Sequence, residues 1–425
     1  MQLLDSIRIR KRGPFEAVVP VPGSKSLTNR ALVVAALADG DSELIRPLAS
    51  DDTAVMVEAL HALGCDIDLT KDTWRVKGRR GRLQRSPAAL YAANSGTTLR
   101  FLTAAAALAD GSVVIDGSPR MRERPIEDLA HALTGLGVRV DVLGENGCPP
   151  VRVHGGDFRG GRVTIDASRS SQYVSAVLLA APYARNDVLL DLRDGVLVSR
   201  PYVELTMQIM RFFGGDVRWT RDDAIRVSRD HRYEGRRYAI EPDASSAVYP
   251  FCAAAITGGQ TRVEGIPADS IQADVAILDI LERMGCSVVR GKDYIELRGP
   301  VGRLIPVDVD MNDFPDGALA IAVVALFAGG TTRIRNVANL RIKESNRLLA
   351  LETELRRLGA NARATVDSLI IEPGRLHAAE IETYDDHRMA MAFSVAGLRI
   401  DGVVIRNPAC VSKTWPEYFS VLEHL

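Results

Sequence analysis

The most constraining feature of the sequence is a unit that recurs six times. Each copy opens with a short polar or acidic cluster. With one residue of each cluster taken as a marker, the markers stand at nearly equal intervals, at Ser24, Ser95, Ser170, Ser245, Asp316 and Asp386. Because regular spacing along a whole chain is typical of structural repeats, we expect the fold to be assembled from six similar pieces.

Each copy has the same predicted order of elements. An Ala-rich apolar stretch such as RFLTAAAALADG predicts a buried helix of about three turns, and a β-rich segment such as TRVEGI follows. A polar loop then leads to an amphipathic helix, clearest in RLLALETELRRLG. Glycines stand where these second helices should end in a left-handed residue, at Gly64, Gly137, Gly285 and Gly359.

A unit of roughly 72 residues is too small to bury a core of its own, but three units can share one. We therefore expect an α/β (α+β) protein of two similar domains with three units each. The first domain is predicted at 21–240, and the second at 1–20 and 241–425. The opening strand should pair within the second domain, and two chain crossings near 15–21 and 239–243 should form a two-strand hinge.

Composition limits the class of protein. The 425 residues are 46% hydrophobic and 25% charged with a net charge of −1, so no overall field favours nucleic acid. The five cysteines are scattered without a CxxC pair, which fits a reducing cytoplasm. No secretory leader is evident, and no apolar run reaches the ~18 residues that a membrane span needs.

The polar clusters are predicted to lie at helix starts, where free N–H groups attract anions. Clusters of the first half are hydroxyl-rich or basic, whereas those of the second half carry carboxylates at Asp243, Asp316 and Asp386. The first-half clusters could bind phosphate, while the carboxylates of the second half could accept and donate protons. The alternative for any single cluster is simple helix capping.

Lysine is scarce, with 7 Lys against 46 Arg among the 53 basic residues. Three of these lysines, Lys25, Lys343 and Lys413, fall in the polar clusters or loops. Because lysine has an accessible pKa and arginine does not, these positions are candidates for proton transfer. The loop arginines at 120, 122, 124, 200, 341 and 347 could equally be solvated surface.

Several familiar motifs are missing. The stretch GSKS lacks the upstream glycine of a P-loop, and no GxGxxG or HExxH occurs. Of the seven histidines only His387 lies in a cluster, so neither a metal nor a nucleotide mechanism is supported.

Nine segments together resemble the 5-enolpyruvylshikimate-3-phosphate synthases, a branch of the enolpyruvyl transferase family. In order they are PGSKSLTNRALVVAALA, NSGTTLRFL, PRMRERPI, SSQYVSA, LVSRPY, EPDASSA, RIKESNR, DDHRMAMAF and SKTWP. The resemblance implies transfer of the carboxyvinyl group of phosphoenolpyruvate to the 5-hydroxyl of shikimate 3-phosphate, without cofactor or metal, on the way to chorismate and the aromatic amino acids. It also implies βαβαββ-like units in two closing domains.

The resemblance also implies site residues. Shikimate 3-phosphate would be held mainly by the first domain, at Lys25, Ser26, Arg30, Ser170, Ser171, Gln172, Ser199, Tyr202, Asp316, Asn339 and Lys343. Phosphoenolpyruvate would meet Lys25, Gly96, Thr97, Arg124, Gln172, Arg347, Arg388 and Lys413, partly from the second domain. Asp316 is expected to be the base and Glu344 the acid; Lys25, Lys413 and His387 complete the catalytic set.

Three positions depart from the pattern of this family: Phe101, Asn346 and Arg169. Gly96 implies sensitivity to glyphosate, which occupies the phosphoenolpyruvate site in the family, and Phe101 could alter that sensitivity. The alternatives are an enolpyruvyl transferase acting on UDP-N-acetylglucosamine, whose loop cysteine is missing from PRMRERPI, and an RNA-binding protein using the Arg-rich segment 220–238. We expect a monomer with two small-molecule substrates, no nucleic acid and no membrane partner.

Overall fold

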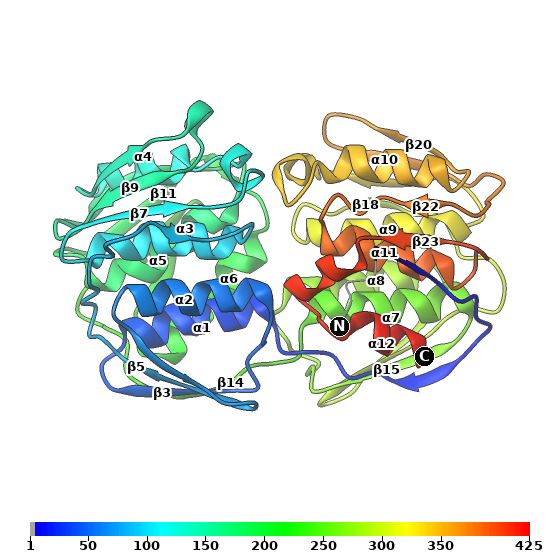
Figure 1. Ribbon diagram of the computed structural model, residues 1–425, viewed down its shortest axis with the longest axis horizontal. Helices are drawn as coiled ribbons and strands as arrows, with labels where there is room; N and C mark the ends of the chain where they lie inside the picture. The colour runs from blue at the N-terminus through cyan, green and yellow to red at the C-terminus, as the bar shows by residue number, and fades with distance from the viewer. Residues whose placement is uncertain (1–4) are drawn as a thin grey trace. The chain divides into compact units, whose positions relative to one another are not determined.

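The computed structural model describes residues 5–425, which divide into two compact units. The first-half unit spans Gly23–Glu241, and the second-half unit comprises residues 5–22 and 242–425. These bounds lie one or two positions beyond those expected from the repeat. Each unit contains three copies of the repeat (Figure 1).

The three repeats of the first-half unit each comprise four strands and two helices. Repeat one contains β14 (Arg237–Ala239), α1 (Lys25–Leu37), β3 (Asp41–Ile45), α2 (Asp51–Ala62), β4 (Asp66–Leu69) and β5 (Thr73–Lys77). Repeat two contains β6 (Leu90–Tyr91), α3 (Gly96–Ala105), β7 (Ser112–Asp116), α4 (Glu127–Gly135), β8 (Arg139–Val142) and β9 (Val151–His154). Repeat three contains β10 (Gly161–Ala167), α5 (Ser171–Ala180), β11 (Val188–Leu197), α6 (Arg200–Phe212), β12 (Val217–Arg221) and β13 (Ala224–Val227).

The second-half unit repeats this order, with a shortened last copy. Repeat four contains β2 (Glu16–Val18), α7 (Ala244–Thr257), β15 (Gln260–Glu264), α8 (Ile277–Arg283), β16 (Ser287–Arg290) and β17 (Tyr294–Arg298). Repeat five contains β18 (Asp308–Asp310), α9 (Ala318–Val324), β19 (Thr332–Arg335), α10 (Arg347–Arg357), β20 (Asn361–Ala364) and β21 (Leu369–Glu372). Repeat six contains β22 (Glu380–Ile381), α11 (His387–Gly397), β23 (Val404–Arg406), a 3-10 segment (Pro408–Lys413), α12 (Tyr418–Glu423) and β1 (Ser6–Arg8).

The sheets follow one pattern. In repeats one to five, the first strand pairs parallel with the second, the second pairs antiparallel with the fourth, and the third lies outermost, as in the order β6-β7-β9-β8. Repeat six has the order β22-β23-β1, with β1 in the antiparallel place. The βαβαββ unit is therefore present five times in full and once in shortened form.

The first helix of each repeat forms the core of its unit. In the first-half unit α1, α3 and α5 pack against one another, and in the second-half unit α7, α9 and α11 do so. Alanine-rich sequences permit this close approach, and every residue of α7 is buried. The second helices are amphipathic and cover the outside. Gly64, Gly137, Gly285 and Gly359 follow four of them with φ of +83°, +92°, +104° and +96°, as predicted.

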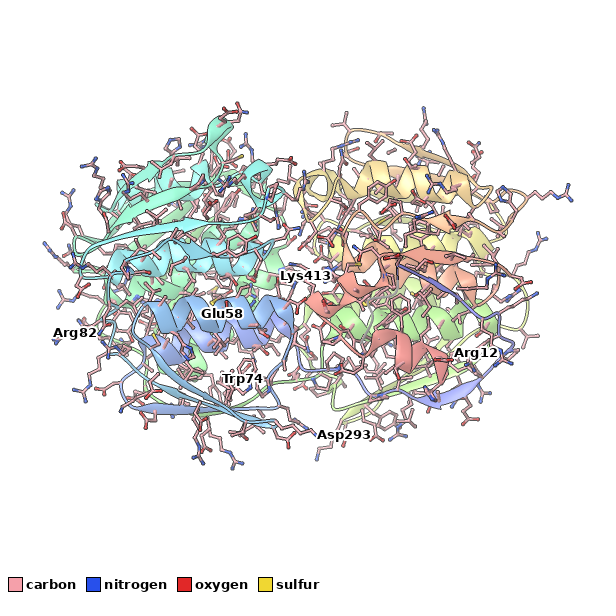
Figure 2. All side chains as sticks on the ribbon, in the orientation of Figure 1. Arg12, Glu58, Trp74, Arg82, Asp293 and Lys413 are labelled. Carbon is pink, nitrogen blue, oxygen red and sulfur yellow. The ribbon has the colours of Figure 1, made fainter. Side chains whose placement is uncertain are left out.

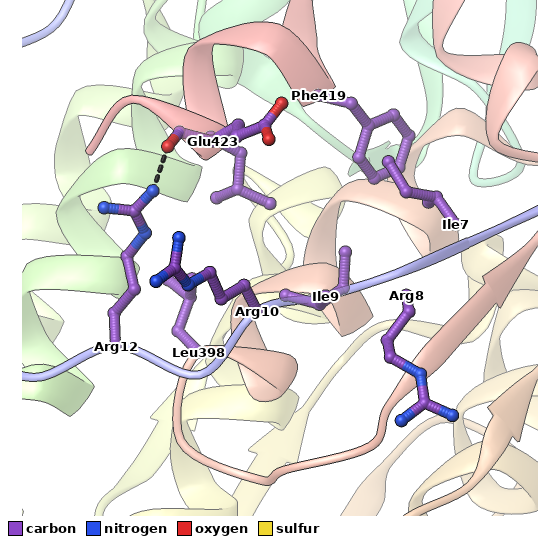
Figure 3. A pocket seen from close by; sticks show the side chains of 9 residues that line it. Ile7, Arg8, Ile9, Arg10, Arg12, Leu398, Phe419 and Glu423 are labelled. Atoms are coloured by element: carbon purple, nitrogen blue, oxygen red, sulfur yellow. Dashed lines mark hydrogen bonds between the residues drawn. The ribbon is translucent and has the colours of Figure 1, made fainter.

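The amino-terminal segment belongs to the second-half unit, as expected. β2 pairs parallel with β15, with Glu16 opposite Gln260, and β1 pairs antiparallel with β23, with Ser6 opposite Arg406. A hollow of about 140 Å³ separates this segment from α12 and is lined by Ile7, Ile9, Leu398 and Phe419 among others. Arg12 donates a hydrogen bond to the backbone carbonyl of Glu423 beside it (Figure 3). None of the helices within residues 5–425 is long and apolar enough to cross a membrane.

Candidate active site

Lys25 is the first residue of α1, and its ammonium group lies 3.3 Å from a carboxylate oxygen of Asp52 in the first turn of α2. The Lys25 side chain is 13% exposed, whereas that of Asp52 is 2% exposed. The pair therefore presents a partly exposed cation at the start of a buried helix. The same helix start offers backbone N–H groups to an anion.

Arg30 is one helical turn further along α1 and is 1% exposed. Its Nε donates to Thr206 Oγ1 at 2.7 Å, and its terminal nitrogens donate to the backbone oxygens of Ser26 at 3.0 Å and Tyr202 at 3.2 Å. The guanidinium also lies 5.2 Å from the ring centre of Phe101.

No carboxylate within residues 5–425 forms an ion pair with Arg30. Burial lowers the pKa of its guanidinium to about 10, against the smaller opposing effects of Tyr202 and Tyr238. A desolvated cation without a counter-ion is energetically costly. Arg30 therefore favours an anionic ligand in this unit.

The start of α3 forms a cradle with no side chain at its centre. A Cβ added at Gly96 would lie 2.6 Å from Nη1 of Arg100, 2.8 Å from Nη2 of Arg124 and 3.1 Å from Oε1 of Gln172. Arg100 donates to Gln172 at 2.6 Å, and Arg124 donates to the backbone and side-chain oxygens of Asn94, both at 3.1 Å. Two guanidinium groups thus converge on a glycine at a helix start, an arrangement suited to a small anion.

The hydroxyl residues of the first-half unit lie at two further helix starts. Ser170 caps α5 by accepting from the backbone N–H of Gln172 at 3.2 Å, and Ser171 is buried beside it. Ser199 precedes α6 with φ of +53°, and Tyr202 is in the first turn of that helix. Asn29 of α1 donates to Thr97 Oγ1 of α3 at 2.8 Å, which ties two helix starts together.

Asp316 lies at the centre of a group of charged side chains in the second-half unit. Its Oδ1 lies 3.3 Å from the ammonium of Lys343 and 2.9 Å from Nη1 of Arg347, and its Oδ2 lies 3.2 Å from Nη2 of Arg388. Burial opposes the charged form of this carboxyl, but Lys343, Arg388 and Arg347 outweigh it and hold the pKa well below its usual range. Asp316 is therefore ionised at neutral pH.

Arg347 joins three carboxylates. Its Nε and Nη2 donate to the two oxygens of Asp386 at 2.7 and 3.1 Å, and Nη2 lies 2.9 Å from Glu344. With the Asp316 contact, four donor–acceptor contacts occupy a side chain that is fully buried. Burial alone would lower the pKa of Arg347, but Asp386, Glu344 and Asp316 raise it. Three cations and three anions thus form one network.

The remaining predicted residues of this unit lie around that network. Asn339 is in the 3-10 segment Ala338–Ile342, which packs on the segment of Asp316, and its buried Oδ1 has no hydrogen-bond partner within residues 5–425. His387 is 1% exposed, with Nδ1 3.7 Å from Asp386. Lys413, labelled in Figure 2, ends the 3-10 segment that follows β23.

At two places the structure decides between alternatives that the sequence leaves open. Asp316 does not cap a helix: it lies inside a 3-10 turn, Pro315–Gly317, and its carboxylate faces cations instead. The loop arginines also do not behave alike. Arg120 and Arg122 are surface residues paired with Glu123 and Asp116, whereas Arg124 and Arg347 are buried. Burial thus separates Arg124 and Arg347, which face inward, from Arg120 and Arg122, which remain at the surface.

Three further residues of the candidate site have no role assigned from the sequence. Asp386 was a repeat marker, but its role as the acceptor for Arg347 was not predicted. Asp52 follows a helix-capping serine, and that proximity to a helix start was the only signal for it. Thr206, which holds Arg30 and also donates to Ser175 at 2.9 Å, carries no signal in the sequence.

Comparison with known proteins is consistent along the whole chain. The EPSP synthase family, 3-phosphoshikimate 1-carboxyvinyltransferase, matches residues 9–422. The chain is 44% identical to the 3-phosphoshikimate 1-carboxyvinyltransferase of Trichormus variabilis over 96% of both chains. It is 45% identical to that of Pectobacterium atrosepticum over 95% of both chains.

Solved structures agree. EPSP synthase from Acinetobacter baumannii superimposes with a TM-score of 0.80 at 27% identity, covering 99% of this chain and 97% of that one. The enolpyruvyl transferase NikO from Streptomyces tendae has the same fold, with a TM-score of 0.80 at 20% identity and the same coverage.

Proposed function

The chain belongs to the EPSP synthase family, and we propose that the site residues of its two units perform different parts of the reaction of that family. The enzyme transfers the carboxyvinyl group of phosphoenolpyruvate to the 5-hydroxyl of shikimate 3-phosphate in aromatic amino acid biosynthesis. The full-length identity to curated 3-phosphoshikimate 1-carboxyvinyltransferases carries this conclusion. The roles of individual residues are our proposal.

Arg30 is the main anion receptor for shikimate 3-phosphate in the first-half unit. The other residues proposed to hold this substrate are Lys25, Ser26, Ser170, Ser171, Gln172, Ser199, Tyr202, Asp316, Asn339 and Lys343. The absence of a carboxylate partner for the buried Arg30 among the described residues supports this role. Ser170 and Ser171, at the start of α5, add hydroxyl and N–H donors for a phosphate group. The Oδ1 of Asn339, unpartnered within residues 5–425, supports its role as an acceptor for a substrate hydroxyl.

Phosphoenolpyruvate is held by the Gly96 cradle and by Arg388, with Arg347 behind it. Because a Cβ at residue 96 would lie 2.6 and 2.8 Å from nitrogens of Arg100 and Arg124, glycine leaves both guanidinium groups in place to bind an oxyanion. Arg347 has four of its donor contacts taken by carboxylates, so it contributes little to binding directly and instead fixes Asp386 and Glu344. Lys25 and Lys413 supply the remaining positive charge.

Asp316 accepts the proton of the attacking hydroxyl. Glu344, a carboxylate paired with Arg347 in the unliganded chain, takes a proton from Lys25 or Lys413 and delivers it to the methylene carbon of phosphoenolpyruvate. Three cations make Asp316 a weak base in the unliganded chain. When shikimate 3-phosphate binds Lys343 and phosphoenolpyruvate binds Arg388, the anions offset those positive charges and raise the pKa of Asp316 toward the value that general-base catalysis needs. Loss of phosphate and of a methyl proton from the tetrahedral adduct restores the double bond.

We propose a monomeric enzyme of the cytoplasm, with no nucleic-acid partner. The decisive experiment is phosphate release when phosphoenolpyruvate and shikimate 3-phosphate are mixed with the purified chain. UDP-N-acetylglucosamine serves as the control acceptor. Phosphate release with the control acceptor alone would assign the chain to the other branch of the enolpyruvyl transferases. A salt-sensitive gel shift with RNA would be the evidence for the RNA-binding alternative.

A further inference from the structure

The loop before α11 has a shape that L-amino acids rarely adopt. Tyr384 and Asp385 are consecutive and both have left-handed backbones, with φ of +55° and +54°. Neither is glycine, so the conformation persists only if other contacts hold it. The segment Glu382–Asp386 connects β22 with the start of α11.

This loop determines where Asp386 lies. The backbone N–H of Asp386 donates to the carbonyl of Thr383 at 2.9 Å, and its side chain accepts from the backbone N–H of Arg388 at 3.0 Å. The same carboxylate takes two donors of Arg347. A change in loop shape would therefore shift Asp386 and, with it, both arginines that contact Asp316.

Glu354 of α10 holds the other end of the loop. Its side chain is fully buried, and its Oε1 accepts from the hydroxyl of Tyr384 at 2.8 Å. Its Oε2 accepts from the backbone N–H of Glu382 at 3.3 Å and lies 3.1 Å from Arg357. Glu354 follows Arg347 by about two helical turns, so both lie on one face of α10. One helix thus binds the loop at two points.

Stability alone gives little reason for a carboxylate at this position. Burial raises the pKa of Glu354, against the opposing effects of Tyr384 and Arg357, so its surroundings disfavour the charged form. Apolar side chains of similar volume often replace buried charges at no loss of stability. What an apolar side chain cannot do is accept hydrogen bonds from the hydroxyl of Tyr384 and the N–H of Glu382.

We propose that Glu354 and Tyr384 are positioning residues for Arg388, which binds phosphoenolpyruvate, and for Arg347 behind it, acting through the left-handed loop and Asp386. The inference rests on the proposed function, in which Arg388 binds phosphoenolpyruvate. Neither residue touches the reacting atoms. Their contribution is to keep Arg388 and Arg347 in one arrangement before the substrate arrives.

Tyr384→Phe is the most selective test, because it removes one hydroxyl and leaves the ring. We expect KM for phosphoenolpyruvate to rise about three- to tenfold, with KM for shikimate 3-phosphate within about twofold of the wild type. Glu354→Ala should have a larger effect, and Glu354→Gln, which keeps a carbonyl for the tyrosine hydroxyl, a smaller one. Hydrogen exchange should become faster at the amides of Asp386 and Arg388.

Matched controls are available in the same unit. Glu352→Gln removes a carboxylate that pairs with Arg356 at 2.8 Å on the same helix without contacting the loop. Tyr294→Phe removes a tyrosine hydroxyl from β17 of the same unit. Both should leave KM for phosphoenolpyruvate and the two amides unchanged.

The outcomes distinguish a failure of the positioning role from a failure of the proposed phosphoenolpyruvate assignment. An unchanged KM for phosphoenolpyruvate and unchanged amide exchange in Tyr384→Phe would overturn the positioning role, even if Glu354→Ala fails to fold. Arg388→Lys tests the premise. If that variant leaves KM for phosphoenolpyruvate unchanged while Tyr384→Phe still accelerates exchange at Asp386, the loop is positioned as inferred and the ligand assignment is wrong.

Discussion

Tyr183 and Arg399 occupy equivalent places in their repeats and make equivalent contacts. Tyr183 stands as far beyond its repeat marker Ser170 as Arg399 stands beyond Asp386. Tyr183 donates to the backbone carbonyl of Leu37 at the end of α1, and Arg399 donates to that of Ile256 at the end of α7. A phenol and a guanidinium thus perform one task, joining the third core helix of a unit to the first at their carboxyl ends.

Tyr183→Phe should destabilise the first-half unit by about 1 kcal/mol, because the carbonyl of Leu37 loses a donor in a partly buried place. Denaturant unfolding and hydrogen exchange at the amides of α1 measure the loss of stability. Tyr91→Phe, at a position that is 58% exposed, is the control and should change nothing. Equal protection of α1 in both variants would contradict the prediction.

Asp316→Ala should leave shikimate 3-phosphate bound but reduce kcat about 100-fold or more, since a positioned general base contributes on that scale. Rapid-quench measurement of turnover and equilibrium binding of shikimate 3-phosphate separate the two effects. Retention of more than about a tenth of the wild-type kcat would remove Asp316 from the base role.

The low pKa of Asp316 also predicts a pH dependence of stability. A carboxyl whose pKa is lower in the folded chain than in the unfolded chain stabilises the fold above the unfolded pKa, near 4, and loses that contribution as the pH falls toward the folded pKa. The difference in free energy of unfolding between wild type and Asp316→Asn should be constant above about pH 5 and shrink below about pH 4. Asp293→Asn, at an exposed loop carboxylate outside the Asp316 network, serves as the reference for an Asp-to-Asn substitution.

Gly96→Ala should raise KM for phosphoenolpyruvate about tenfold, because the added methyl group lies 2.6 and 2.8 Å from nitrogens of Arg100 and Arg124. Glyphosate should inhibit the wild type competitively with phosphoenolpyruvate and should inhibit the variant less. Gly13→Ala, where a Cβ meets nothing within 4 Å, is the matched control. Uncompetitive inhibition of the wild type would contradict the shared site.

Lys413→Arg should reduce kcat about tenfold or more, although the charge is kept, because a guanidinium does not release a proton at neutral pH. The pH profile of kcat is the informative measurement. Near wild-type activity would mean that Lys413 contributes charge alone.

The six-part architecture was readable from the sequence because each core helix is Ala-rich and each copy keeps nearly the same length. The two units and the pairing of the opening strand followed from the same regularity. The shortened sixth repeat was not predicted, since β1 and its partner β23 lie near opposite ends of the chain. No local pattern reports a strand borrowed from the other end of the chain.

The resemblance assigns the candidate site residue by residue, but it does not predict the contacts among those residues. Arg347 and Asp386 belong to different repeats and meet only because α10 and α11 start on the same side of one core. The left-handed conformation of Tyr384 and Asp385 has no signal in the sequence, because neither residue is glycine. Contacts of this kind depend on tertiary packing, which composition and periodicity do not report.

The place of β1 and β2 bears on the order in which the chain acquires its structure during synthesis. The first-half unit has all its strands once residue 239 has left the ribosome, so it can fold while the rest is being made. Residues 5–18 leave the ribosome before the first-half unit does, yet their partners β15 and β23 come much later, the second beginning only at residue 404. This early segment is therefore among the last of the described residues to form its strand pairs.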